Sequence, residues 1–201
     1  MKILLVSDEE DKYLWDYYRP GRLAGIDLIL SAGDLKAEYL SFLVTMANRP
    51  LLYVPGNHDG DYARRPPEGC QCIDGSLVTI GGLRILGLGG SIMYSGGPHQ
   101  YTEAQMRRRI NSLRPKLWRA GGVDILLTHS PARGYGDEEN AAHRGFEAFL
   151  PLLDKYAPRY MIHGHVHRRY DLSRPRCLQY GGTSIINATG RHILEIEDCS
   201  L

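Results

Sequence analysis

The chain has 201 residues, with 24 basic and 23 acidic side chains and a net charge of +1 at neutral pH. This length fits a single domain spanning residues 1–201, large enough to bury an apolar core without disulfides or structural zinc. A charge so close to zero gives no reason to expect nucleic acid or an anionic membrane as an obligatory partner.

The cysteine pattern and the start of the chain indicate the compartment. The four cysteines are too few and too scattered for a disulfide framework, and the first residues run directly into an apolar strand rather than a signal peptide. A run of about 18 apolar residues, which a membrane-spanning helix needs, is also missing. We therefore expect a soluble protein of the reducing cytoplasm without a membrane partner.

The first half of the chain alternates between strand and helix patterns. Short apolar runs at residues 3–6, 26–30 and 51–54 have the length and branched composition of buried strands. Between the second and third runs, apolar residues at i, i+3, i+4 and i+7 from Leu40 predict a helix that packs on a sheet. Right-handed crossovers between such strands produce a parallel sheet.

The middle of the chain changes character. Residues 77–80 and 83–88 predict a hairpin, because the Gly81-Gly82 pair between them suits a primed turn. The glycine-rich stretch 89–101 is too long for a simple connection, which favours a functional rim or lid.

A second helix is predicted to begin after this loop. Thr102 suits the N-cap, and Gln105 completes a capping box. The basic run 107–109 lies within this helix, where a solvated helix face and a phosphate-steering patch both fit the pattern.

The last third predicts further strands and one helix. A strand at 125–127 precedes a loop at 130–144 and a helix that Pro151 must either kink or restart. The apolar run 160–162 predicts a strand that continues through His165 and His167.

Three short strands are predicted after that point, at 177–180, 184–187 and 192–196. They suit a second, largely antiparallel sheet. The predicted fold class is α/β, a four-layer αββα sandwich in which two packed mixed β-sheets are flanked by helices.

Five polar clusters each follow one of the apolar strands. They occupy residues 8–10, 33–34, 56–59, 128–129 and 164–167. Because strands of one sheet end along a common edge, the clusters can converge there. Carboxylates, an amide and four histidines form the ligand set of a two-metal hydrolytic centre.

The clusters resemble those of the calcineurin-like metallophosphoesterases, whose pattern is Asp-x-His, Gly-Asp, Gly-Asn-His-(Asp/Glu), a lone His and Gly-His-x-His. Gly56-Asn57-His58-Asp59 and Gly164-His165-Val166-His167 match fully, with Gly33-Asp34 and His129 in the expected order. The resemblance spans residues 3–167. It implies a hydrolase of phosphoric ester bonds, and small single-domain members include phosphodiesterases that act on cyclic nucleotides or artificial diesters. The implied partner is thus a phosphate ester, such as a nucleotide or cyclic nucleotide.

The resemblance also implies a role for each matching residue around two divalent metal ions. The implied ligands are Asp8, Asp34 and His167 for the first ion, and Asp34, Asn57, His129 and His165 for the second. On an extended strand, His165 and His167 would face the same way roughly 6.6 Å apart, which lets them straddle two ions.

The implied chemistry is in-line attack on phosphorus. A hydroxide that bridges the two ions, both bound by Asp34, would be the nucleophile. His58 would protonate the leaving oxygen, as the family's equivalent histidine does.

One position departs from the family pattern, because Glu10 stands where the Asp-x-His motif has histidine. A carboxylate is a harder ligand, which favours manganese, with magnesium, iron or zinc as alternatives. If Glu10 coordinates, the less positive centre should favour diesters over monoesters, a hypothesis that the ratio of the two activities in Glu10→His would test. If Glu10 turns away, metal occupancy should be near one ion per chain.

Three residues outside the motifs are candidate substrate contacts, namely His99, His143 and Arg144. All three lie in or beside long loops, where binding residues concentrate. For His143 and Arg144 the alternative is a role in starting and capping the following helix.

Two other functions fit the same pattern. A non-catalytic metal-binding scaffold is known in this fold, the retromer subunit; intact Asn57 and His58 favour an enzyme, whereas Glu10 favours the scaffold. A phosphomonoesterase or protein phosphatase would keep the mechanism, but the family's Asp-Arg-Gly extension is replaced here by Leu35-Lys36-Ala37.

Overall fold

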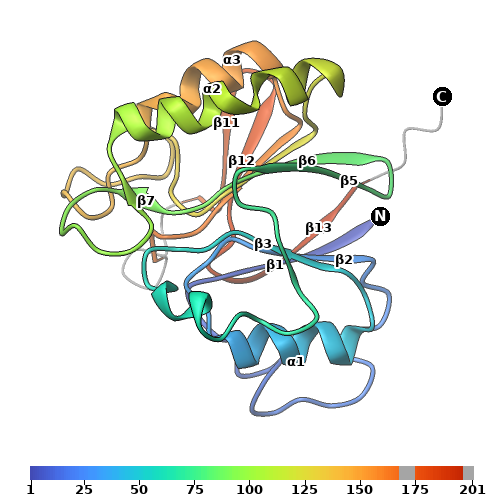
Figure 1. Cartoon of the computed structure of the whole chain (residues 1–201). Coiled ribbons are helices and arrows are strands. Elements are labelled where there is room, and N and C mark those ends of the chain that lie inside the picture. Colours follow the sequence, from blue (N-terminus) through green and yellow to red (C-terminus); the bar gives the residue numbers. More distant parts are fainter. Residues whose placement is uncertain (168–174, 197–201) are drawn as a thin grey trace.

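The computed structural model describes residues 1–167 and 175–196. Two β-sheets pack face to face between helices, as Figure 1 shows. Helix α1 (Ala37–Ala47) covers one outer face, and α2 (Glu103–Arg119) and α3 (Leu150–Tyr156) cover the other. The predicted α/β fold with two mixed sheets flanked by helices is therefore confirmed.

The first sheet contains five strands in the described part of the chain, in the order β13-β1-β2-β3-β4. Their bounds are β13 (Gly190–Glu195), β1 (Lys2–Ser7), β2 (Leu28–Ser31), β3 (Leu51–Tyr53) and β4 (Gln71–Cys72). Strands β1 to β4 run parallel, and β13 is antiparallel to β1. The short 3-10 helix Gly60–Ala63 lies between β3 and β4.

The second sheet has the order β11-β12-β10-β9-β6-β5 among the described residues. The bounds are β11 (Cys177–Tyr180), β12 (Thr183–Asn187), β10 (Tyr160–His163), β9 (Ile125–Thr128), β6 (Leu83–Leu88) and β5 (Ser76–Ile80). Its four inner strands are parallel, and its two edge strands are antiparallel to their neighbours. Gly81 and Gly82 have φ of +55° and +80°, which confirms the predicted primed turn between β5 and β6.

Two predictions about strand pairing are wrong. The five strands that precede the polar clusters do not share one sheet, because β1, β2 and β3 lie in the first sheet and β9 and β10 in the second. The last three strands do not form one antiparallel sheet either. Strand β13 pairs with β1 and places Leu194 in the core between the sheets, while β12 is parallel to β10. Alternating hydrophobicity identifies a strand but not its neighbour.

The core follows the two-residue period of the strands. In β1, Ile3 and Leu5 face the second sheet, whereas Leu4 and Val6 face α1 and the loop before β2. In β9, Leu126 faces α2 and α3 while its neighbours Ile125 and Leu127 face the first sheet. Both sheets are thus apolar on both sides, as sheets covered by helices must be.

The helices begin as their sequences predict. Thr102 and Gln105 form the capping box of α2. Pro151 lies in the first turn of α3, which begins directly after the 3-10 helix Glu147–Phe149. Of the two predicted alternatives, Pro151 therefore lies at the start of a new helix and does not kink one. Within α2, Arg109 is not part of a solvated face: its guanidinium contacts Asp74 at 2.5 Å.

The glycine-rich stretch 89–101 is more ordered than a simple loop. Strands β7 (Ser91–Ile92) and β8 (Gln100–Tyr101) pair in parallel at its two ends. Arg109 also donates to the carbonyl of Gly89 and lies over the Tyr101 ring, which fixes the base of the loop.

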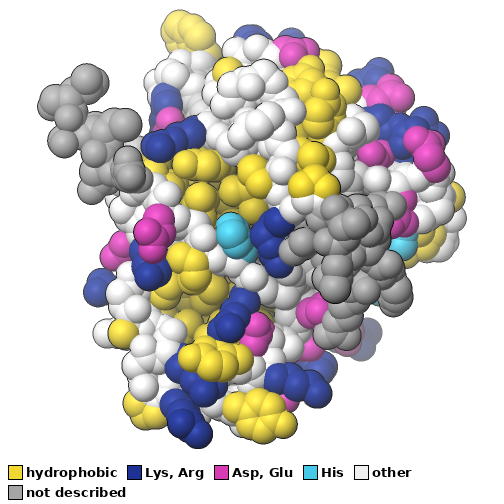
Figure 2. Space-filling view, turned by 180° about the vertical axis from the view of Figure 1, so that it is seen from behind, with side chains coloured by type: hydrophobic (Ala, Val, Ile, Leu, Met, Phe, Trp, Pro, Cys, Tyr) yellow, Lys and Arg dark blue, Asp and Glu magenta, His cyan; other side chains and the backbone are white. Residues whose placement is uncertain are grey.

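Surface and chain-wide features agree with the composition. Figure 2 shows cationic and anionic side chains interspersed among apolar ones on the face seen from behind. No helix among the described residues is long and apolar enough to cross a bilayer. Cys70, Cys72 and Cys177 are free thiols, and Cys199 lies outside the described residues.

Candidate metal centre

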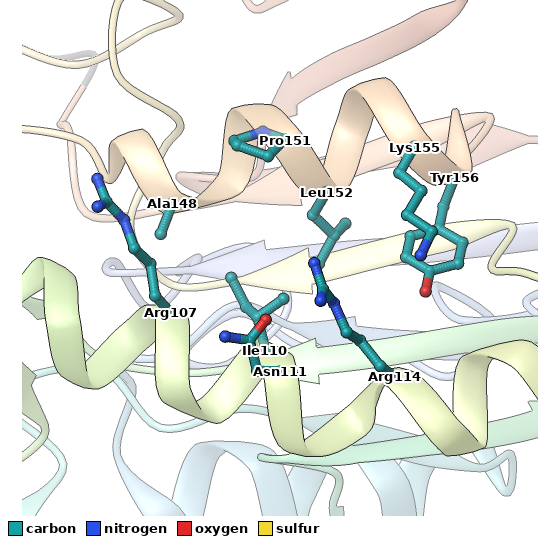
Figure 3. A pocket seen from close by; sticks show the side chains of 9 residues that line it. All are labelled: Arg107, Ile110, Asn111, Arg114, Ala148, Pro151, Leu152, Lys155 and Tyr156. Carbon is teal, nitrogen blue, oxygen red and sulfur yellow. The ribbon is translucent and has the colours of Figure 1, made fainter.

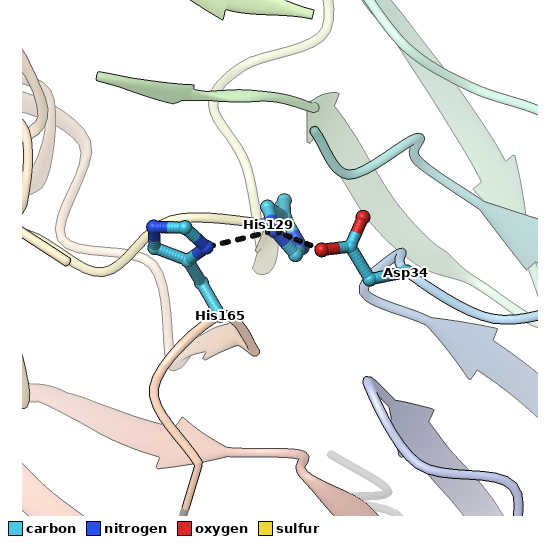
Figure 4. A group of neighbouring side chains, drawn as sticks. All are labelled: Asp34, His129 and His165. Atoms are coloured by element: carbon cyan, nitrogen blue, oxygen red, sulfur yellow. Dashed lines mark hydrogen bonds and ion pairs between the residues drawn. The ribbon is translucent and has the colours of Figure 1, made fainter. Parts of the chain in front are cut away.

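The candidate site lies where the two sheets bring together the carboxyl ends of five strands. Asp8, Asp34 and Asn57 follow strands of the first sheet, and His129 and His165 follow strands of the second. The ligand atoms of Asp34, His129 and His165 all lie within 4.8 Å of one another. Figure 4 shows the His129 ring between the carboxylate of Asp34 and the ring of His165.

His129 is fully buried, and its backbone contact fixes the role of each ring nitrogen. Its Nδ1 lies 2.7 Å from the carbonyl oxygen of Ala32, which can only accept a hydrogen bond. Nδ1 therefore carries the hydrogen, and Nε2 of the neutral ring presents a lone pair to the site.

Three further acceptor atoms surround that lone pair. Nε2 of His129 lies 3.3 Å from Oδ2 of Asp34, 3.1 Å from Oδ1 of Asn57 and 3.1 Å from Nδ1 of His165. Because Nε2 of His165 donates to the carbonyl of Ala142 at 2.6 Å, its Nδ1 also presents a lone pair. Four acceptors that face one another away from bulk water require a cation between them. The group could therefore hold a metal ion, and it can hold a proton when no metal is bound.

The electrostatics agree with this interpretation. Burial alone would raise the pKa of Asp34, but the nearby His129 ring lowers it to about 2. Burial alone would lower the pKa of His129, but the Asp34 carboxylate outweighs it and raises the value to about 9. Burial and the charge of His129 lower the pKa of His165 to about 3. In the metal-free protein at pH 7, His129 therefore carries a second ring proton, on Nε2.

Three site residues have left-handed backbone conformations, which side chains other than glycine rarely adopt. Asp8, Asp34 and His165 have φ of +62°, +56° and +68°. Such conformations concentrate at functional sites. They also overturn one prediction: β10 ends at His163, so His165 and His167 do not lie on an extended strand, because the chain turns at His165 to aim its ring toward His129.

Two glycines of the motifs allow neighbouring loops to approach closely. A Cβ atom at Gly56 would lie 2.1 Å from Oδ1 of Asp34, and one at Gly164 would lie 1.9 Å from Oγ of Ser7. Neither position has room for a side chain. These glycines therefore set the distance between the strand ends that carry the ligands.

Asp59 is a site residue whose role the sequence did not reveal. Its buried Oδ2 accepts hydrogen bonds of 2.8 Å from the backbone N–H groups of both Asp34 and Gly56. Burial raises its pKa to about 6. The side chain ties the loop after β2 to the loop after β3 and so positions Asp34.

His58 lies at the edge of the group. Its backbone N–H donates to Oδ1 of Asp34 at 2.8 Å, and its side chain is exposed. Together with Asp34 and Glu10, it lines an open cavity of about 310 Å³. An exposed imidazole beside such a cavity can reach a bound molecule.

Of the remaining predicted ligands, Asp8 contacts the backbone of the group. Both carboxylate oxygens of Asp8 accept from the backbone N–H of His165, at 3.0 and 2.9 Å, and Oδ2 also accepts from Thr189. Burial raises the pKa of Asp8. Asp8 thus supports the turn at His165.

Glu10 and His167 face other partners. Oε1 of Glu10 lies 3.6 Å from Nζ of Lys36 and accepts from its backbone N–H. Nδ1 of His167 lies 3.3 Å from Oε1 of Glu9, a residue that the motif comparison passed over because it occupies the variable position. Glu9 is therefore in contact with a predicted ligand, whereas Glu10 shares only a cavity lining with Asp34.

The three candidate substrate residues differ in position. The His143 ring lies 5.2 Å from the His165 ring, held by Asn140. Arg144 is exposed and pairs with Glu147 at 3.9 Å, in line with the alternative role at the helix start. His99 is half-buried in the glycine-rich loop, with φ of +50°. Of the three, His143 lies beside the metal group.

Tyr94 is another residue that no motif indicated. Its hydroxyl accepts a hydrogen bond from Nδ2 of Asn57 at 3.2 Å, which directs Oδ1 of Asn57 toward His129. Oε1 of Gln100 accepts from three consecutive backbone N–H groups of this loop, at 3.0 to 3.1 Å, including that of Tyr94. The glycine-rich loop thus presents Tyr94 to the amide of Asn57.

Tyr94→Phe should lower the affinity for divalent metal about 10- to 100-fold, the usual effect of losing a partner that orients a ligand. Without the hydroxyl, the Asn57 amide loses the contact that directs its oxygen inward. Isothermal titration calorimetry measures the affinity, and Tyr17→Phe, at an exposed position, is the matched control. Equal affinities for the two variants would show that Tyr94 does not position Asn57.

Comparisons with known proteins agree with the fold and the motifs. Residues 1–169 match the model of the family described as calcineurin-like phosphoesterase. The "UPF0046 protein K07C11.7" of Caenorhabditis elegans is 26% identical over 184 residues, which cover 81% of this chain and 62% of the relative. The "UPF0046 protein T07D4.2" of the same organism is 37% identical over 68 residues, 33% of this chain and 16% of the relative. The chain thus spans less than two thirds of these curated relatives.

Solved structures share the architecture at low identity. The crystal structure of TT1561 of Thermus thermophilus has a TM-score of 0.64 at 18% identity, covering 94% of this chain and 89% of that one. A further crystal structure has a TM-score of 0.70 at 14% identity, with coverage of 96% and 94%. These similarities show a common fold. Since the family model covers most of its length, the chain belongs to the calcineurin-like phosphoesterase family.

Proposed function

We propose that this protein is a metal-dependent phosphodiesterase with a two-metal centre. The observation that supports the proposal most strongly is the convergence of four potential ligand atoms from Asp34, Asn57, His129 and His165. Two nitrogens, an amide oxygen and a carboxylate oxygen suit a first-row divalent ion.

These four residues would hold the second ion, and the first would lie toward Asp8 and His167, with Asp34 as a ligand of both. Glu9, 3.3 Å from His167, and Glu10, which lines the same cavity as Asp34, are the two candidates for a further carboxylate ligand there. Hard oxygen ligands favour manganese, with magnesium, iron or zinc as alternatives. When bound, such ions stabilise charge on the phosphoryl oxygens and activate water.

The chain's own residues supply orientation and proton transfer. His58 would donate its proton to the leaving oxygen, since its exposed ring borders the cavity that also contains Asp34. The hydrogen bond from the backbone N–H of His58 to Oδ1 of Asp34 fixes the position of the two residues relative to each other. Lys36 and Arg65 line the same cavity and can bind the anionic substrate.

The proposed preference for diesters rests on the carboxylates near the first ion. Three carboxylates, from Asp8, Asp34 and either Glu9 or Glu10, offset most of the charge of two divalent ions. A diester carries one negative charge and a monoester approaches two, so a less positive centre gives the monoester a smaller electrostatic advantage than a centre with histidine at position 10 would. The substrate class proposed is therefore a phosphodiester such as a cyclic nucleotide.

The proposal is tested by the hydrolysis of bis-p-nitrophenyl phosphate and p-nitrophenyl phosphate. Chelator-stripped protein reloaded with manganese should turn over the diester faster. His58→Ala should lose about 10²- to 10⁴-fold of the rate, the contribution of a general acid, while it retains its bound metal.

His192→Ala, on β13, serves as the matched histidine control. Metal binding without turnover of either ester would instead favour a non-catalytic scaffold. Faster turnover of the monoester would favour a phosphomonoesterase.

Metal binding should release one proton per ion from this site near pH 7. The pKa of about 9 means that His129 is protonated in the metal-free protein, and a ligand must be neutral to bind. Apparent affinity should then rise about tenfold per pH unit and level off above pH 9, where the proton is already lost. Calorimetry in buffers of different ionisation enthalpy counts the protons, and a count of zero at pH 7 would contradict the proposed site.

A further inference from the structure

The outer face of the second sheet carries a groove whose lining includes none of the metal ligands. It has a volume of about 250 Å³ and lies between α2 and the segment that leads into and forms α3. Figure 3 shows its lining side chains, with Arg107 and Arg114 rising from α2 and Lys155 and Tyr156 on α3. Neither helix contributes a residue to the metal centre.

The groove has an apolar floor and a basic rim. Ile110, Ala148 and Leu152 form the floor and are 8%, 4% and 3% exposed. Arg107, Arg114 and Lys155 line the rim, and none of the nine lining residues is acidic. An apolar strip between cations is complementary to an apolar ridge flanked by carboxylates.

The rim cations are largely unneutralised. Arg107 has only distant partners, Glu103 at 4.0 Å and Glu147 at 3.8 Å. Arg114 and Lys155 pair with no acidic group within the part of the chain that the structure describes. The whole of α2 carries six basic side chains and one acidic one, in a chain whose net charge is +1. Positive charge is therefore concentrated on this helix.

An exposed tryptophan extends the same face of α2. Arg107, Asn111, Arg114 and Trp118 recur at intervals of four and three residues, so they share one side of the helix. Trp118 is 83% exposed, the largest fraction among the exposed large hydrophobic side chains. Tryptophan and arginine are the residues that most often dominate the energy of protein interfaces.

We propose that this groove binds an acidic amphipathic helix of a partner protein. A groove between two neighbouring helices suits a third helix, whose apolar stripe would cover the floor and whose carboxylates would reach Arg114 and Lys155. Helix α2 has 17 residues and is about 25 Å long, enough for a helix of similar length. A flat membrane surface would not reach the recessed floor of the groove. A nucleic acid is also disfavoured, because its phosphate backbone offers no apolar surface to cover that floor.

The test uses a fluorescein-labelled peptide as long as α2, with leucine at i, i+3, i+4 and i+7 and glutamate on both flanks. Fluorescence anisotropy with the full chain should show binding that weakens at higher salt. A scrambled peptide of equal composition should bind at least about tenfold more weakly, because it lacks the apolar stripe. Trp118→Ala should weaken binding of the amphipathic peptide about tenfold.

Two double charge-reversal variants test whether the peptide binds in the groove. Arg114→Glu with Lys155→Glu should weaken peptide binding about 10- to 100-fold. Arg108→Glu with Lys116→Glu changes the net charge equally on the side of α2 away from the groove, and should leave binding within about twofold. Circular dichroism checks that both variants remain folded.

Two results would overturn the proposal. One is equal weakening by the two double variants, which would indicate general attraction to a basic helix. The other is binding of phosphatidylserine vesicles or a single-stranded oligonucleotide, sensitive to the groove variant, in the absence of peptide binding. The hydrolysis experiments do not bear on this surface, since no groove residue lies in the metal centre.

Discussion

Asp34→Asn is expected to abolish metal binding and hydrolysis while leaving the fold intact. The variant removes the only carboxylate that faces the lone pair of His129, at 3.3 Å, among the four converging groups. Loss of a residue that merely orients a ligand costs about 10- to 100-fold in affinity, so loss of a charged ligand should cost more than about 100-fold. Calorimetric metal affinity and the rate of diester hydrolysis measure the effect.

The same variant should lose metal binding without losing the stability of the metal-free fold. The amide introduced in place of the Asp34 carboxylate can donate to Nε2 of His129, which satisfies that lone pair without a metal or a proton. Thermal unfolding of the metal-free variant should therefore match that of the metal-free parent. Asp16→Asn, at an exposed position, controls for loss of one negative charge. Retention of tight metal binding by Asp34→Asn would show that the four acceptors are not the metal site.

Gly56→Ala should disable the centre although it replaces no chemical group. The new Cβ would lie 2.1 Å from Oδ1 of Asp34 and 2.7 Å from Cε1 of His129, so both side chains must move. A displacement of about 1 Å from productive geometry costs on the order of 100-fold in rate. Overpacking also destabilises the fold by about 1–3 kcal/mol. Hydrolysis rate and thermal unfolding measure the two effects.

Gly182→Ala is the matched control, because a Cβ there meets nothing within 4 Å. It should retain the rate, the metal affinity and the unfolding temperature of the parent. If Gly56→Ala behaved like this control, the close approach of the loops after β2 and β3 would not be needed for function.

The layered fold was predictable because hydrophobic periodicity is a local signal. The runs that became β1, β2, β3, β9 and β10, and the stripe that became α1, were all recognisable within about ten residues. Strand pairing is not local. Nothing near Leu194 indicates that β13 joins the first sheet beside β1 and not the second beside β12. The division of the metal-binding strands between two sheets was missed for the same reason.

The site was predictable only where side chains define it. The order of the motifs indicated Asp34, Asn57, His129 and His165, which the structure brings together. The contacts that orient these residues come from backbone carbonyls of Ala32 and Ala142, which carry no sequence signal. Tyr94 reaches Asn57 across 37 positions of the chain, and only the folded loop reveals that contact.

The left-handed turn at His165 was missed because a histidine next to a strand is ordinarily extended. Its conformation is supported from a distance, by the carboxylate of Asp8 at the other end of the chain. Long-range support of a strained residue is typical of functional sites. A sequence pattern can identify a ligand residue, but it does not give the direction in which the side chain points.

We propose that the lone pairs around His129 hold a catalytic metal ion. The most direct measurement is anomalous diffraction at the manganese edge from crystals of the manganese-loaded protein. We expect a peak within about 2.0–2.4 Å of Nε2 of His129 and Nδ1 of His165, with Asn57 and Asp34 as the other ligands. Manganese bound elsewhere, with these four groups free of metal, would contradict it.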